Sequence, residues 1–260
     1  MWVALEPMLF AGVLLGLRML GLIMALPGIG TGAFPAPTRI ILTLFLTVFC
    51  YSVIGLPFVP VPQELWSAAP MVAREFLVGA ALGLTIKVFM GFADAGGALV
   101  GQFGSLAMAS QVDPSSGHES TAVANLLGVV GGLALVSMDG HYLALGGLFD
   151  NLALFPLGGR SPVGFAPGAL VQMGQGLFIA AMKVAAPVIL VTTLVNVGMA
   201  LLARAAPQLN IFSVGFAAVL LVTFSFLDTA VVSVSEVYDN TLGELPDLMN
   251  RNLVTAGAAP

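Results

Sequence analysis

The sequence predicts an all-α, polytopic membrane protein of kinked, glycine- and proline-rich helices and helical hairpins. Apolar residues make up 58% of its 260 residues, and charged residues make up only 8%. Mean hydropathy is +1.03. A soluble domain carries about a quarter charged residues, so lipid or other apolar subunits must cover most of this surface. The apolar runs also lack the period-two alternation of strands, which favours helices throughout.

The apolar runs are separated at turn signals, and each is expected to be helical. Proline and glycine clusters divide most of them, whereas Asp94 and Lys183 stand between two pairs of runs. A helix needs about 20 apolar residues to cross a bilayer, and some runs are shorter. We therefore expect roughly six spans together with hairpins or interfacial helices. The runs are 8–27, 39–59, 71–93, 95–110, 121–138, 141–157, 165–182, 184–203 and 208–235.

Glycines recur at a spacing of four residues within several runs. The chain has 31 glycines, and this spacing places two on one helix face. Small residues there let two backbones approach closely where lipid gives no hydrophobic drive to associate, although glycine is also common in membrane helices generally. We expect dense helix–helix contacts at these positions. The pairs are Gly12/Gly16, Gly79/Gly83, Gly97/Gly101 and Gly128/Gly132.

Ionisable residues lie inside or beside the runs and leave two interpretations. A charge at membrane depth must be paired or must face protein or water, so these residues indicate either an ion pathway or structural pairing and snorkelling. A proton relay needs several acidic groups or histidines within the spans, whereas the acids here lie mostly at run boundaries. The structural interpretation is favoured. The residues weighed are Arg18, Arg74, Glu75, Lys87, Asp94 and Lys183.

The polar segment 110–120 contains Ser, Asp and His, so a membrane hydrolase must be considered. Ser115 or Ser116 would act as nucleophile with His118 as base. Such groups must be held within hydrogen-bond reach by a rigid scaffold, and a single Pro/Gly loop offers none. A conformationally special loop between two apolar helices is the favoured interpretation.

Metal, nucleotide and nucleic-acid signals are weak. His118-Glu119 lacks a second histidine at helical spacing. Asp139-Gly140-His141 lacks further ligands and is better explained as a polar helix terminus. No Gly-Lys-Ser/Thr loop predicts a nucleotide site, and no basic face predicts nucleic-acid binding. We expect no metal, no cofactor and no nucleic acid.

A second polar interruption lies between Asn196 and Phe216. Proline removes helical hydrogen bonds, and neighbouring amide and hydroxyl side chains can satisfy the freed backbone groups. An ordinary loop between two membrane helices and a polar bend at a subunit contact both fit these residues. They include Asn196, Arg204, Pro207, Gln208, Asn210 and Ser213.

Three blocks, in the expected order, resemble the FliR family of flagellar export-gate proteins. The first is Arg74-Glu75-Phe-Leu-Val-Gly79 with Gly83. The second is Met108–Gly117, followed by an apolar helix and Met138-Asp-Gly-His141, and the third is Leu201–Gly215. The Asp-Pro-Ser-Ser-Gly and Asp-Gly-His forms look more flagellar than those of the injectisome relatives.

This resemblance implies one copy of a structural, non-enzymatic subunit of the type III export gate. In the family, this subunit forms the gate together with FliP and FliQ. The gate is the closed channel through which unfolded flagellar proteins are secreted, with FlhB in the same assembly and FlhA nearby. The expected location is the bacterial inner membrane at the flagellar basal body. The implied parts are a FliP-like region of about 1–180, a FliQ-like hairpin of about 181–240 and a polar tail of 241–260. The alternatives are an injectisome gate subunit and, less favoured, a stand-alone membrane transporter or channel.

The resemblance also assigns the loop of about 106–120 to a plug in the channel. Pro114 and Gly117 permit a bent path, and Leu106 and Met108 supply apolar sealing. The predicted plug residues are Leu106, Met108, Gln111, Asp113, Pro114, Ser115, Ser116 and Gly117. The predicted subunit-contact or structural residues are Arg74, Glu75, Asp139, His141, Asn196, Arg204, Pro207, Gln208, Asn210 and Ser213.

Overall fold

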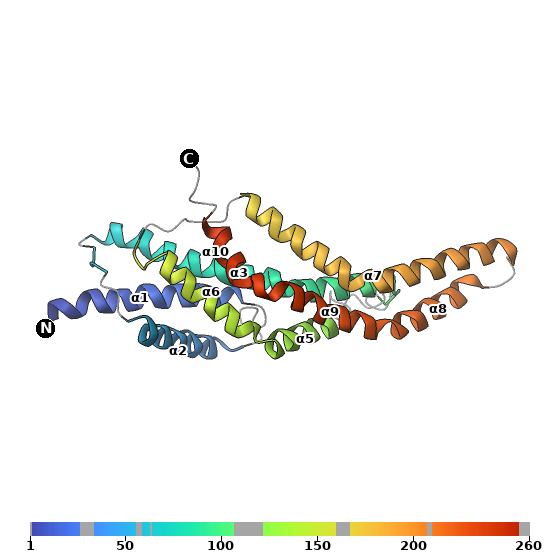
Figure 1. Cartoon of the computed structure of the whole chain (residues 1–260), viewed down its shortest axis with the longest axis horizontal. Coiled ribbons are helices and arrows are strands. Elements are labelled where there is room, and N and C mark those ends of the chain that lie inside the picture. The colour runs from blue at the N-terminus through green and yellow to red at the C-terminus, as the bar shows by residue number, and fades with distance from the viewer. Residues whose placement is uncertain are drawn as a thin grey trace. The chain divides into compact units, whose positions relative to one another are not determined.

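The computed structural model describes residues 2–26, 34–55, 59–62, 64–106, 122–159, 167–206 and 210–254. Over these residues the regular elements are helices (Figure 1), which confirms the predicted all-α class. They are α1 (Trp2–Ala25), α2 (Ala36–Ile54), α3 (Leu65–Phe103), α5 (Ala122–Ser137), α6 (Gly140–Leu154), α7 (Pro167–Ala205), α8 (Ile211–Ser225), α9 (Leu227–Thr241), the short 3-10 helix η2 (Leu242–Glu244) and α10 (Leu245–Val254).

Several helices are long and apolar enough to cross a membrane. Helices α1, α2, α3 and α7 each contain such a segment, and two bent pairs raise the total from four to six within the described residues. The pairs are α5 with α6, bent by 68°, and α8 with the helical segment from Leu227 to Arg251, bent by 42°. The predicted polytopic class is confirmed, and the expected six spans are the upper end of this range.

Two expected breaks between runs are wrong. Helix α3 continues through Asp94, and α7 continues through Lys183. Each helix has 39 residues, which corresponds to about 58 Å at 1.5 Å per residue. A lone charged residue keeps its backbone N–H and does not end a helix, and both side chains are exposed. The charges therefore divide the hydropathy profile without dividing the helix.

The expected break at Asp139 is confirmed, whereas the run 208–235 is divided where none was expected. Asp139 separates α5 from α6 and has φ 58°, a left-handed conformation that aspartate tolerates better than most residues. Phe226 separates α8 from α9 with φ −99° and ψ 1°. Its N–H still donates to the Val222 carbonyl oxygen at 3.0 Å, so the chain bends there without unwinding.

The chain forms two compact units. Unit 1 contains Met1–Phe89, Tyr142–Met173 and Glu244–Pro260, and unit 2 contains Met90–His141 and Gly174–Gly243. The expected FliP-like and FliQ-like parts remain a prediction, because they describe likeness to other proteins and not the packing within this chain.

Close packing of α1 on α3 forms the centre of unit 1. A Cβ atom at Gly79 would collide with the Arg18 carbonyl oxygen, and one at Gly83 with the Leu22 carbonyl oxygen. From the other side, a Cβ at Gly21 would lie 2.8 Å from the Ala80 nitrogen. Only glycine allows these backbones to approach so closely. The expected dense contact at Gly79/Gly83 is confirmed.

The other glycine pairs behave differently. Gly12 and Gly16 face Tyr51 and Thr47 of α2 at ordinary contact distances of 3.8 and 3.7 Å. In unit 2, a Cβ at Gly97 would come within 2.6 Å of Ala124 Cα, which is another close backbone approach. Gly132 faces open space among the described residues, so close contact at that position is not found within this chain.

The segment expected as a polar tail contains η2 and α10. Leu245, Met249 and Leu253 recur at helical spacing and are buried, with 0–1% of each residue exposed. Asn250 Nδ2 donates to the Gly147 carbonyl oxygen of α6 at 3.1 Å. The tail therefore docks an apolar face in unit 1 and turns its charged residues outward.

Candidate functional site

A buried ion pair joins α1 to α3 in unit 1. Arg18 Nη2 lies 2.5 Å from Glu75 Oε2, and the two side chains are 0% and 1% exposed. Arg18 Nε donates to the same carboxylate oxygen at 2.7 Å. Two donors of the same guanidinium thus converge on one carboxylate oxygen, which fixes the orientation of the guanidinium as well as its position.

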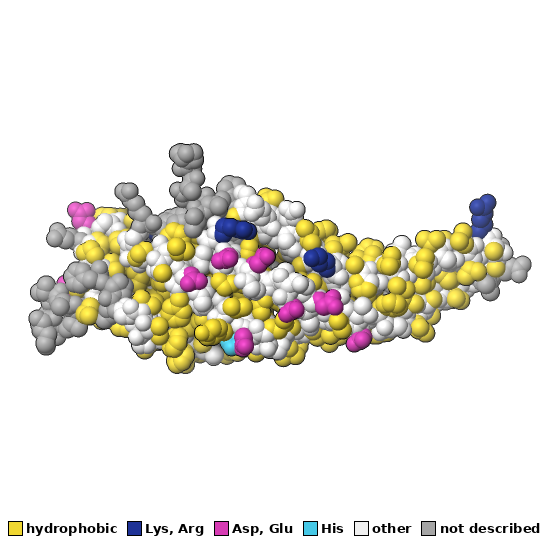
Figure 2. Space-filling view, in the orientation of Figure 1, with side chains coloured by type: hydrophobic (Ala, Val, Ile, Leu, Met, Phe, Trp, Pro, Cys, Tyr) yellow, Lys and Arg dark blue, Asp and Glu magenta, His cyan; other side chains and the backbone are white. Residues whose placement is uncertain are grey.

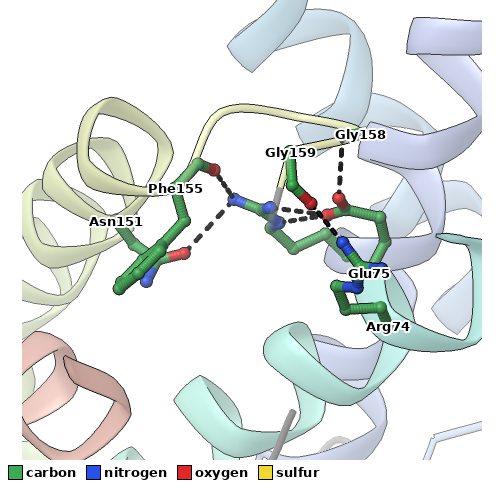
Figure 3. Close-up of polar contacts among 7 residues, drawn as sticks. Arg74, Glu75, Asn151, Phe155, Gly158 and Gly159 are labelled. Atoms are coloured by element: carbon green, nitrogen blue, oxygen red, sulfur yellow. Dashed lines mark hydrogen bonds and ion pairs between the residues drawn. The ribbon is translucent and has the colours of Figure 1, made fainter. Parts of the chain in front are cut away.

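The segment after α6 completes this polar cluster (Figure 3). Arg18 Nη1 donates to the Phe155 carbonyl oxygen at 3.0 Å and to Asn151 Oδ1 at 3.3 Å. On the opposite side, Glu75 Oε1 accepts a hydrogen bond from the Gly158 N–H at 3.1 Å. The cluster therefore ties α1, α3 and the 155–159 segment together, and we call it the α1–α3 clamp.

Neighbouring residues extend the clamp. Arg74 Nη1 donates to the Gly159 carbonyl oxygen, so consecutive residues of α3 hold consecutive residues of the same segment. Gly158 has φ 72°, a left-handed conformation that glycine adopts without a steric cost. The sequence singles out Arg18, Arg74 and Glu75 as charged residues. It does not indicate Asn151 or Gly158, which carry no charge and lie more than 70 positions from Glu75.

The clamp has the chemistry of a structural site. Arg18 and Glu75 are both desolvated and are paired with each other, which is the condition under which ionised groups persist in an apolar interior. This is the pairing within a helical assembly that the sequence favoured for Arg18 and Glu75 over an ion pathway. An additional contact of Arg74 or Glu75 with another subunit remains a prediction.

Polar residues of the α7–α8 connection cap α8 in unit 2. Asn210 Oδ1 accepts a hydrogen bond from the Ser213 N–H at 3.4 Å, and Ser213 Oγ donates to the Asn210 carbonyl oxygen at 3.1 Å. Both bonds lie at the N-terminus of α8 and form its cap. The sequence expectation that these two residues satisfy backbone groups freed by Pro207 stays a prediction, because Pro207 lies outside the described residues. Arg204 lies exposed in the last turn of α7, where its charge complements the helix dipole.

The remaining predicted residues are dispersed. Asp139 and His141 are exposed around the α5–α6 turn, and Asn196 is exposed on α7. Leu106 is half-buried in the turn after α3, where its N–H donates to the Gly101 carbonyl oxygen at 3.0 Å. The other predicted residues lie outside the described part of the chain; they are Met108, Gln111, Asp113, Pro114, Ser115, Ser116, Gly117, Pro207 and Gln208.

The hairpin of α7 and α8 in unit 2 exposes large apolar side chains (Figure 2). Leu190, Leu194 and Leu201 of α7 are 73%, 71% and 66% exposed, and Leu221 of α8 is 69% exposed. The two helices meet where Met199 Cε lies 3.5 Å from the Cβ position of Gly215. Apolar exposure of this extent marks a surface that meets lipid or other subunits.

These features define an all-α, multi-pass membrane protein whose own chain leaves much apolar helix surface uncovered. The chain belongs to the family described as bacterial export proteins, family 1, which matches residues 9–245.

Curated relatives agree with the FliR resemblance found in the sequence. The flagellar biosynthetic protein FliR of Caulobacter vibrioides is 26% identical over 239 residues, covering 92% of this chain and 95% of the relative. Its namesake in Escherichia coli K12 is 27% identical over 233 residues, covering 90% and 88%. That of Bacillus subtilis 168 is 25% identical over 255 residues, covering 96% of both chains.

Proposed function

We propose that this chain is a structural subunit of the flagellar type III export gate, located in the bacterial inner membrane at the flagellar basal body. It forms with FliP and FliQ the closed channel through which unfolded flagellar proteins leave, with FlhB in contact and FlhA nearby. It has no catalytic turnover of its own. The family match and the relatives named FliR support this assignment, and they favour a flagellar over an injectisome gate.

The uncovered α7–α8 hairpin carries the proposal. Beside its exposed leucines, the unit 2 part of α7 has Gly174, Gly176 and Gly198. Apart from the neighbouring backbone of α7 itself, no described heavy atom lies within 4 Å of a Cβ built at any of them. Where two helices of this chain pack closely, as α1 and α3 do beside the clamp, a glycine such as Gly79 lies at the contact. Small residues are the usual contact points between membrane helices. Glycines that no other described helix approaches therefore support the binding of helices from other subunits.

The loop between α3 and α5 is the proposed plug of the channel, and its described ends are anchored in unit 2. A Cβ at Gly97, six residues before the end of α3, would lie 2.6 Å from Ala124 Cα near the start of α5. The Gly104 N–H donates to the Val100 carbonyl oxygen at 2.8 Å, which closes the end of α3. The end of α3 and the start of α5 are therefore closely packed. This packing supports a loop between them that blocks a pore without loosening either helix.

Deleting residues 111–117 tests the plug, because it removes the polar centre of the loop and keeps both anchored ends. We expect the assembled gate to conduct ions at rest, measured as ion flux in proteoliposomes or as growth inhibition by salt. A deletion of equal length in the terminal segment 254–260 is the control. Unchanged permeability of an assembled gate would remove the plug assignment.

Native mass measurement tests the function as a whole. The tagged chain is co-expressed with FliP and FliQ, extracted in mild detergent and weighed. One copy within a large hetero-oligomer is the expected result. Replacing Gly198 with Leu, which projects a branched side chain from the hairpin, should reduce assembly. A stable monomer or homo-oligomer that ignores these partners would contradict the proposal and favour a transporter.

A further inference from the structure

An apolar groove of about 580 Å³ lies between α1 and α2 in unit 1. Its walls include Leu9 and Val13 of α1 and Leu44 and Val48 of α2, which are between 56% and 67% exposed. Gly12 faces Tyr51 and Gly16 faces Thr47, so the helices run antiparallel. The missing side chains of these glycines leave the groove open. Its volume lies within the range of about 300–1,000 Å³ typical of ligand clefts.

The two threonine hydroxyls of the groove wall are already satisfied. Thr47 Oγ1 donates to the Thr43 carbonyl oxygen at 2.6 Å, and Thr43 Oγ1 donates to the Arg39 carbonyl oxygen at 2.7 Å. These hydroxyls therefore offer no donor to a bound group, and the threonine methyls add to the apolar wall. The groove suits a hydrocarbon chain and does not suit a polar ligand.

The two ends of the groove differ in charge. Arg39 adjoins the lining residue Ile40 at one end, and its side chain is half-buried. Its Nε and Nη2 donate to the Phe34 carbonyl oxygen at 3.1 and 3.0 Å, which holds the guanidinium in place. An arginine has five N–H groups, so others stay open to an anion. At the opposite end the exposed Glu6 lies two residues before the lining residue Met8.

The length of the groove matches one bilayer leaflet. From Ile40 to Tyr51, α2 rises about 16 Å at 1.5 Å per residue, which is close to half of the roughly 30 Å hydrocarbon thickness. Both α1 and α2 contain candidate membrane spans. We propose that the α1–α2 groove binds an anionic phospholipid, with one acyl chain along Val13 and Val48 and the phosphate at Arg39. The proposal does not depend on the export-gate assignment.

Fluorescence quenching by brominated lipids tests this site in the full-length protein. Trp2 and Trp66 are replaced by Phe, and Leu44→Trp then places a single reporter in the groove. The bilayers contain either brominated-chain phosphatidylglycerol or brominated-chain phosphatidylcholine. We expect half-maximal quenching at a several-fold lower mole fraction of phosphatidylglycerol. Val48→Trp is a second reporter for the case in which Leu44→Trp does not fold.

Matched variants distinguish a specific phospholipid site from non-specific contact with the bilayer. Arg39→Gln should abolish the preference for phosphatidylglycerol, and Arg39→Lys should retain most of it. Leu133→Trp is the control reporter, because Leu133 is 65% exposed on α5; it should show no preference. Equal quenching by both lipids at Leu44→Trp would overturn the proposal. The proposal would also be overturned if the groove reporter were not quenched while the α5 reporter in its own variant was quenched, because a protein helix would then cover the groove.

Discussion

Replacing Glu75 with leucine leaves Arg18 buried without its partner. Both side chains are at most 1% exposed, so neither charge can recover hydration without unfolding part of unit 1. Removing one member of a buried pair costs about 3–5 kcal/mol, which corresponds to a change of about two to nearly four orders of magnitude in the folding equilibrium. Glu75→Leu also removes the acceptor of the Gly158 N–H. We therefore expect the cost at the upper part of that range.

The double variant Arg18→Met with Glu75→Leu removes both charges at once. Because an apolar pair of similar volume often substitutes for a buried ion pair without loss, we expect it to recover most of the stability. Reversible unfolding in mixed micelles, followed by circular dichroism, measures each free energy of unfolding. Glu236→Leu on the exposed face of α9 is the matched control and should change that energy by less than about 0.5 kcal/mol. A double variant as unstable as the sum of the two single variants would refute the reasoning.

Three further predictions concern packing and capping. Gly79→Ala should destabilise unit 1 by several kcal/mol, because the added Cβ meets the Arg18 carbonyl oxygen. The control Gly132→Ala adds a Cβ that faces open space among the described residues and should be neutral or slightly stabilising. Equal effects of the two substitutions in the same unfolding assay would contradict the close packing. Asn210→Ala should cost about 1 kcal/mol by removing the cap on the Ser213 N–H, and Asn210→Asp should keep most of it; hydrogen exchange at the start of α8 measures the loss. Met249→Ala should cost about 2–5 kcal/mol, because this side chain is 0% exposed; a thermal-shift change below about 2 °C would show that α10 is not docked.

The class of the fold can be predicted from the sequence, because a protein surrounded by lipid needs an unusually apolar composition. A chain with 8% charged residues can be covered only by lipid or other apolar protein, and backbone groups in lipid are satisfied within helices. Helix boundaries are harder to predict, since hydropathy measures side chains whereas hydrogen bonds define helices. Asp94 and Lys183 lower the local hydropathy and leave α3 and α7 intact. Phe226 keeps hydropathy high and still marks a bend.

The clamp is only partly predictable for a different reason. The need to pair Arg18 follows from the cost of a charge in an apolar run, but several residues of opposite charge could supply the partner. Glu75 is 57 positions away, and the choice depends on the close approach of α1 and α3 at Gly21 and Gly79. The uncharged residues of the clamp cannot be predicted from the sequence, because Asn151 and the Phe155 carbonyl oxygen come within hydrogen-bond distance of Arg18 only once α6 has packed.

The position of α10 in unit 1 has a consequence for biosynthesis. Among the described helices, the ribosome makes α1 and α2 before the others and α10 after all of them, yet α10 packs in the same unit as α1 and α2. Until α10 emerges, Gly147 lacks the hydrogen bond from Asn250 and the contact with Pro246. Unit 1 thus completes its fold only after α10 has been translated, which is after every described segment of unit 2. In the nascent chain, α1, α2 and α6 are therefore translated before the helix that packs in their unit. A premature stop codon just before α10 removes part of unit 1 and not a dispensable tail.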